Sequence, residues 1–313
     1  MPDTDELART HQRGQRTLVQ RSVAAMVRGL GLLSRDRPGP SWTGGVDEQV
    51  LAAVIAAQQE SARNGAAYVR QVLRAAGVRS RLAGRVASGA LAGTASDGRA
   101  LDSLLGYPIA VAVRNIENGM DPDEAFQRLI RRMAMIAATQ VADAGRVATG
   151  IAQAADPVVL GYVRVVDLPA CSRCILLAGA FYAWSDGFQR HPNCDCTHRP
   201  VTSLDEVRGA RDTRDLPARM FGQMSRAEQD RAFGRAGAQA IRDGANLGQV
   251  VNARRGISTA GGRLITTEGT TRRGTARRRG SPSPRLMPEA IYREADGDRD
   301  KAIRLLKRYG FIT

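Results

Sequence analysis

The chain has 313 residues, of which 43% are hydrophobic and only 4% are aromatic. This length can bury a core and form two or more units, and an apolar content dominated by Ala, Val and Leu favours helices over a large sheet. The formal net charge is +15, which indicates a polyanionic neighbour, although the strong preference for Arg over Lys is also typical of a GC-rich genome. No apolar run approaches a membrane span and the amino terminus is acidic, so we expect no membrane association and no secretion signal.

The first half of the chain is predicted to be helical. Residues 7–34 and 47–76 are rich in Ala, Gln, Arg and Val, and a further helix is expected at about 100–118. Asp121 then supplies an N-cap, followed by proline at the first helical position and by apolar residues at helical spacing. We therefore expect residues 1–155 to form a helical region whose apolar faces pack together.

The pattern changes at residue 156. The β-branched run at 158–166 predicts a strand, and it leads into a cysteine-rich segment that is too short to bury a full core. A metal would supply the missing cohesion, so residues 156–203 are expected to form a small central α+β zinc-knuckle module in a mainly α protein. Capping boxes at Ser203 and Ser225 then predict a return to helices over residues 204–253.

Four cysteines and two of the three histidines fall within 28 residues. A C-x2-C pair followed by H-x2-C-x-C has the paired spacing with which two loops bind one tetrahedral zinc ion. So many thiolates can close the coordination sphere, which favours a structural role for the zinc. The candidate ligands, with His198 in reserve, are Cys171, Cys174, His191, Cys194 and Cys196.

Other uses of these residues stay open. The four cysteines could form two disulfides or remain free thiols. A Cys/His hydrolase could use Cys171, His191 and Asp195, but it would leave three cysteines unexplained. A metal-dependent hydrolase or nuclease would keep one coordination position open, with His191 or His198 beside a carboxylate. We expect no catalytic residues, with protease and metal-dependent hydrolase as the alternatives.

A basic segment occupies residues 254–285, with nine Arg against one acidic residue. Its low hydrophobicity predicts a flexible linker, and its charge predicts non-specific contact with DNA phosphates. The alternative is a solvated linker in an Arg-biased proteome. Residues 286–313 are expected to form a helical hairpin. The candidate DNA-contacting residues are Arg254, Arg255, Arg263, Arg272, Arg273, Arg277, Arg278, Arg279 and Arg285.

Residues 163–200 also carry a resemblance. Their pattern is C-x2-C-x2-L-x-G-x2-Y, then F-x2-H-P-x-C-x-C-x3-P. This segment resembles the metal-binding core of the tailed-phage minor head proteins, the Mu F-like or head morphogenesis family. Residues 228–256 and 264–274 resemble the downstream region of related proteins from phages of actinobacteria, where the gene is often labelled minor capsid protein or capsid maturation protease.

The resemblance implies a structural minor capsid protein that lies inside the phage head near the portal, after assembly in the host cytoplasm. Its expected partners are the portal protein, the coat or scaffold proteins and packaged double-stranded DNA. Two other functions remain as alternatives. One is a capsid maturation protease, and the other is a zinc-stabilised nucleic-acid-binding module or nuclease that is not part of the virion.

Overall fold

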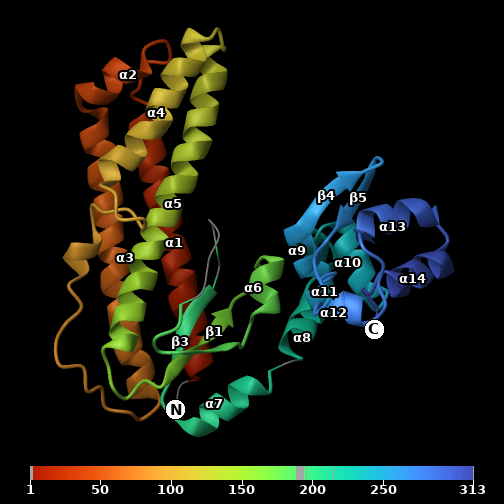
Figure 1. Ribbon diagram of the computed structural model, residues 1–313. Coiled ribbons are helices and arrows are strands. Elements are labelled where there is room, and N and C mark those ends of the chain that lie inside the picture. The colour runs from red at the N-terminus through yellow and green to blue at the C-terminus, as the bar shows by residue number, and fades with distance from the viewer. Residues whose placement is uncertain (1–2, 188–193, 195, 214, 313) are drawn as a thin grey trace. The chain divides into compact units, whose positions relative to one another are not determined.

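The computed structural model describes residues 3–187, 194, 196–213 and 215–312 (Figure 1). The chain is mainly helical with two small antiparallel sheets, as its composition predicts. It divides into two compact units. The first comprises Met1–Asp167 with Gly179–Arg211, and the second comprises Leu168–Ala178 with Asp212–Thr313.

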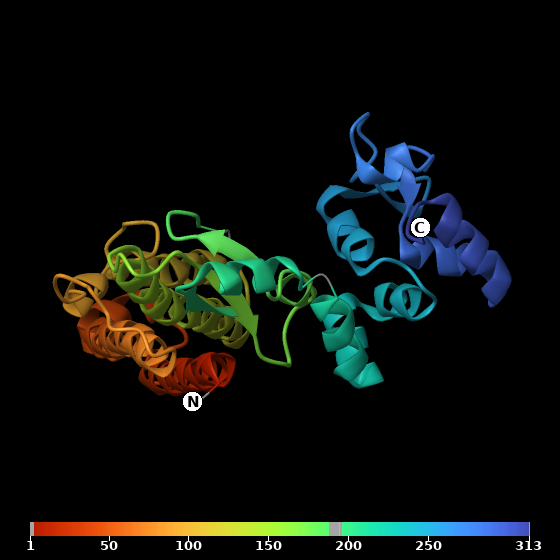
Figure 2. The same cartoon turned by 90° about the horizontal axis from the view of Figure 1, so that it is seen from below.

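Three long helices form the body of the first unit, and each packs against the other two (Figures 1 and 2). At about 1.5 Å per residue, they extend for roughly 40 to 50 Å. Asp121 accepts a hydrogen bond from the Glu124 amide and caps the third of them, as the sequence predicts. The three helices are α1 (Thr4–Leu30), α3 (Asp47–Ala75) and α5 (Pro122–Ala154).

Close contact between these helices depends on two glycines. A Cβ on Gly65 would clash with the carbonyl oxygen of Gly145, and a Cβ on Gly145 would lie 3.0 Å from the carbonyl oxygen of Ser61. Hydrogen bonds join α1 to α3 at the same level. The side-chain amide of Gln15 donates to the Ser61 carbonyl at 3.0 Å, and the Ser61 hydroxyl donates to the side-chain oxygen of Gln15 at 2.8 Å. These contacts fix the relative positions of α1, α3 and α5.

Shorter elements connect and extend the bundle. Helix α4 packs along α5, and its apolar residues join the core of the bundle. Asp156 closes the turn after α5 by accepting hydrogen bonds from the Ser80 hydroxyl and the Arg81 amide. The connecting elements are α2 (Pro38–Ser41), η1 (Trp42–Val46), η2 (Ser88–Leu91) and α4 (Leu101–Glu117).

A three-stranded antiparallel sheet with the order β2-β1-β3 packs against one end of the bundle. Every residue of its central strand is buried. That strand starts at Gly161 rather than at residue 158, because the Asp156 turn holds the preceding residues. The Tyr68 hydroxyl of α3 donates to the carbonyl of His198 at 2.9 Å and ties β3 to the bundle. The strands are β1 (Gly161–Val166), β2 (Phe181–Ala183) and β3 (Cys196–Val201), and α7 (Leu204–Arg211) follows them.

The second unit is built from short helices and a second antiparallel sheet with the order β4-β5-β6. Ser225 and Glu228 form the predicted capping box at the start of α9. The unit contains α6 (Ser172–Leu176), α8 (Leu216–Gln223), α9 (Arg226–Phe233), α10 (Arg235–Arg242), α11 (Leu247–Ala253), η3 (Arg254–Gly256), β4 (Ile257–Ala260), β5 (Arg263–Thr266), α12 (Thr275–Arg278), β6 (Arg285–Leu286), α13 (Pro288–Ala295) and α14 (Arg299–Arg308).

Residues 254–285 differ from the flexible linker expected of them, because they contain η3, β4, β5, α12 and the first residue of β6. A few buried residues, including Thr266 and Ala276, are enough to anchor this polar segment. The Thr266 hydroxyl donates to the Ala253 carbonyl at 2.6 Å, and the Arg277 amide donates to the Gly269 carbonyl at 2.9 Å. The following hairpin of α13 and α14 lies where the sequence predicts it.

Candidate metal centre

Two short chain segments place the cysteines. The chain leaves the sheet after β1 and returns at Gly179, whose amide donates to the Arg164 carbonyl at 2.8 Å. Between these points Cys171 caps helix α6, where its sulfur accepts a hydrogen bond from the Cys174 amide at 3.4 Å. Cys196 is the first residue of β3 and pairs with Val166 at the end of β1. The sheet therefore brings the second cysteine pair to the end of the strand that leads into the first.

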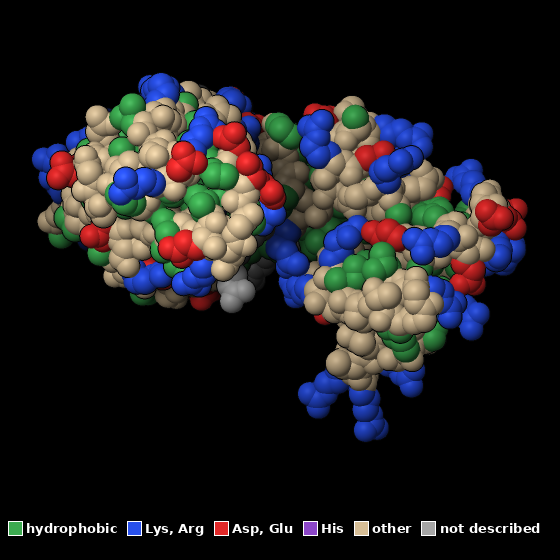
Figure 3. Space-filling model, turned by 90° about the horizontal axis from the view of Figure 1, so that it is seen from above, with side chains coloured by type: hydrophobic (Ala, Val, Ile, Leu, Met, Phe, Trp, Pro, Cys, Tyr) green, Lys and Arg blue, Asp and Glu red, His purple; other side chains and the backbone are tan. Residues whose placement is uncertain are grey.

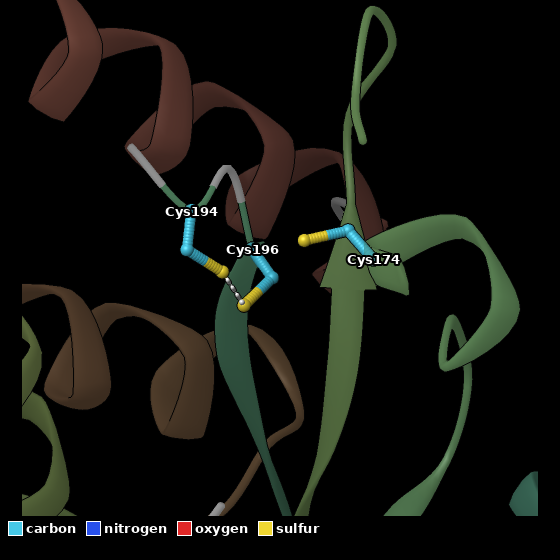
Figure 4. A group of neighbouring side chains, drawn as sticks. All are labelled: Cys174, Cys194 and Cys196. Atoms are coloured by element: carbon cyan, nitrogen blue, oxygen red, sulfur yellow. Dashed lines mark hydrogen bonds between the residues drawn. The ribbon is translucent and has the colours of Figure 1, made fainter. Parts of the chain in front are cut away.

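Three of the four thiols form one cluster. The sulfur atoms of Cys174, Cys194 and Cys196 all lie within 4.8 Å of one another (Figure 4). All three residues are buried, with at most 2% exposure. The Cys194 and Cys196 sulfurs are 3.3 Å apart, and none of the four cysteines forms a disulfide. The two-disulfide alternative is therefore not the state of this structure.

The cluster could hold a metal ion. In a tetrahedral site with metal–sulfur distances of about 2.3 Å, neighbouring sulfurs lie roughly 3.8 Å apart, which is close to the spacing of these thiols. A buried set of three soft donors favours a thiophilic metal over a hard cation such as magnesium or calcium.

Two arginines lie beside this cluster. One guanidinium nitrogen of Arg164 lies 3.6 Å from the sulfur of Cys194, and the side chain of Arg164 is only 2% exposed. Arg146 of α5 donates to the carbonyl oxygen of Cys194 and also binds Asp143 at 3.0 Å. Ionised thiolates carry negative charge, so a buried guanidinium beside them offsets part of the cost of their burial. Neither arginine is among the predicted site residues, although a single Arg inside the apolar run at 158–166 is a visible signal in the sequence.

Of the remaining predicted ligands, only those among the described residues can be placed, and they do not join the three-thiol group. Cys171 is half-buried, and its sulfur lies outside that group among the described residues. His191 falls outside the described residues, so its place among the ligands stays a prediction, and the same holds for Asp195 of the hydrolase alternative. His198 is buried in β3 and stacks on Tyr162, with ring centroids 4.2 Å apart.

The nine candidate DNA-contacting arginines fall into three classes. Arg285 is fully buried, and its guanidinium donates to the carbonyls of Glu268, Tyr309 and Gly310. It therefore holds the second unit together, and its inclusion among the DNA-facing residues was wrong. Arg254 and Arg263 are exposed but form ion pairs with acidic residues of α13, at 2.7 and 3.5 Å.

The other six arginines are exposed and form no ion pair with any described residue. Basic side chains project from the second unit in the space-filling view (Figure 3). This arrangement leaves their charge available to a polyanion. The six are Arg255, Arg272, Arg273, Arg277, Arg278 and Arg279.

A protein-family model described as VG15 protein matches residues 4–227. The chain belongs to the VG15 protein family. This is a family of viral proteins, and the match supports a phage-related protein. The VG15 match includes the bundle, the first sheet and all four cysteines, and it ends before the basic segment. Comparison with curated proteins and with solved structures gave no significant match. None of the helices in the described part of the chain is long and apolar enough to cross a membrane.

Proposed function

We propose that this VG15-family chain is a structural minor capsid protein of the Mu F-like, head-morphogenesis type. The observation that supports this most strongly is the buried cluster of Cys174, Cys194 and Cys196 inside the family match. These thiols belong to the segment whose pattern resembles the Mu F-like core. In this proposal the protein lies inside the head near the portal and contacts portal, coat or scaffold proteins.

The metal in this proposal is zinc with a structural role. Cys174, Cys194 and Cys196 supply three ligands, and His191 or Cys171 supplies the fourth. When bound, zinc contributes cohesion to a segment with little apolar core of its own. Arg164 offsets the negative charge of the ligand set from its buried position in β1. With four protein ligands, the zinc would have no open position for substrate.

Non-specific contact with packaged DNA is the second part of the proposal. The six exposed arginines without ion pairs among the described residues lie on one folded segment of the second unit, from η3 to the residue that follows α12. Their charge would neutralise phosphates without reading bases, because such contacts carry no sequence information.

The protein composition of purified particles tests the virion assignment. Mass spectrometry of particles purified by density gradient should find the chain at low copy number relative to the coat protein. Its absence from particles, with abundant protein in the infected lysate, would contradict the proposal and favour a nucleic-acid-binding module that is not part of the virion.

The protease alternative needs its own test. Purified chain is incubated with coat precursor, and the precursor should stay intact. Cleavage that is lost in Cys171→Ala, with metal content and folding unchanged, would replace the structural assignment with a maturation protease.

A further inference from the structure

The first unit carries an apolar groove of about 910 Å³ between α1 and α5. One wall comes from α1 and the other from α5, and one end is closed by Thr197 and His198 of β3 together with Cys194, which precedes that strand. The apolar residues repeat at roughly one-turn intervals along both walls, and all but the exposed Ala24 are half-buried. They are Val19, Val23, Ala24 and Val27 on α1, and Ala134, Met135, Ala138 and Ala142 on α5.

The dimensions of the groove suit a helix. On α1 the lining residues extend from His11 to Arg28, which corresponds to roughly 25 Å along the helix axis. A groove of this length accommodates four to five turns of a helix, and parallel rows of side chains one turn apart receive the ridges of a third helix.

The charged side chains that line the groove are basic. Among the described residues, the lining contains four arginines and no acidic residue. Arg28 and Arg131 lie toward one end, and Arg16 and Arg146 lie toward the end closed by β3. Neither Arg28 nor Arg131 forms an ion pair with a residue in the described part of the chain.

We propose that this groove binds an amphipathic helix of another protein, with an apolar stripe and acidic residues at the end that lies against Arg28 and Arg131. The apolar floor would bury the stripe, and Arg28 and Arg131 would bind the carboxylates at that end. A second copy of this chain is a poor occupant because its net charge is +15. Duplex DNA would leave the apolar floor without a partner. The inference does not depend on the proposed virion function.

Two synthetic peptides test the charge requirement on the unmodified full-length chain. Both are helical, are about 18 residues long and carry the same Leu/Ala stripe. One has two glutamates one turn apart near one end, and the other has lysines at the same positions. Fluorescence anisotropy should show binding of the glutamate peptide at least about tenfold tighter than that of the lysine peptide.

Charge reversal in the groove supplies the reciprocal test. The double variant Arg28→Glu with Arg131→Glu should lose most of the affinity for the glutamate peptide and gain affinity for the lysine peptide. The matched control is Arg70→Glu with Arg114→Glu, which makes the same change at exposed positions outside the groove and should bind as the unmodified chain does. Circular dichroism confirms that both variants are folded.

Three results would overturn the proposal. The first is equal binding of the two peptides, or no binding of the glutamate peptide at 100 µM, by the unmodified chain. The second is stoichiometric displacement of the bound peptide by duplex DNA, which would make the groove a polyanion site. The third is a dimer in light scattering that Ala138→Trp dissociates, which would make a second copy the occupant. The unmodified chain alone decides the first two, so they stand even if a variant fails to fold.

Discussion

Gly145→Ala should destabilise the helical bundle, whereas Gly150→Ala on the same helix should stabilise it. In a helix, Gly to Ala is favourable by roughly 0.5–1 kcal/mol because alanine loses less backbone entropy on folding. A Cβ at Gly150 meets nothing within 4 Å, so that gain stands alone. A Cβ at Gly145 would lie 3.0 Å from Gln15 Nε2 and from the carbonyl of Ser61, and closer still to the Ser61 hydroxyl.

The carbonyl that obstructs Gly145 is backbone of α3 and cannot rotate away. Overpacking of this kind costs about 1–3 kcal/mol, so the net loss at Gly145 should be about 1–2 kcal/mol. The gain from alanine is common to both variants, so they should differ by the overpacking cost of about 1–3 kcal/mol in the free energy of unfolding, measured by urea denaturation followed by circular dichroism. A Gly145→Ala chain as stable as Gly150→Ala would show that α3 and α5 are not in the contact described.

Three further results are expected. Burial lowers the pKa of His11 from 6.5 to about 4, so the unfolded chain takes up this proton first. The free energy of unfolding should be unaffected by His11 above about pH 6.5 and should fall by up to about 2–3 kcal/mol as the pH approaches 4. His11→Phe keeps a ring against Tyr68 and should remove this pH-dependent loss, as measured by urea titrations at several pH values. Arg285→Met should destabilise the second unit by about 3–5 kcal/mol in thermal unfolding because three carbonyls lose a charged donor, and a loss below about 1 kcal/mol would contradict the buried position. Replacing five exposed arginines with Gln should reduce the slope of log affinity for DNA against log salt concentration by roughly 3–5. An unchanged slope would show that this segment does not contact DNA. The five are Arg272, Arg273, Arg277, Arg278 and Arg279.

The sequence predicted the features that depend on local chemistry. The N-cap at Asp121 and the capping box at Ser225 set helix starts within a few residues, and the spacing of the cysteines anticipated that thiols would gather. The features it did not predict depend on contacts between distant segments. Arg285 sits in a polar, basic stretch, and only its three carbonyl partners make it a core residue.

The groove between α1 and α5 could not be predicted from the sequence either. Val19, Val23 and Val27 have the spacing of ordinary core residues, and only the packing of the bundle leaves them half-buried along an open surface. The ordered structure of residues 254–285 also depends on packing that the sequence pattern does not show. Composition predicts weak cohesion there, but a few buried side chains and the α13–α14 hairpin supply it.

Metal content tests the proposed centre most directly. Freshly purified, reduced chain is analysed by inductively coupled plasma mass spectrometry beside Cys196→Ser, which removes one thiol of the cluster. We expect one zinc per chain in the unmodified protein and loss of that zinc in the variant, because three remaining ligands leave the coordination shell open. Zinc well below about half an equivalent in the unmodified chain, or full zinc in Cys196→Ser, would contradict the centre formed by Cys174, Cys194 and Cys196.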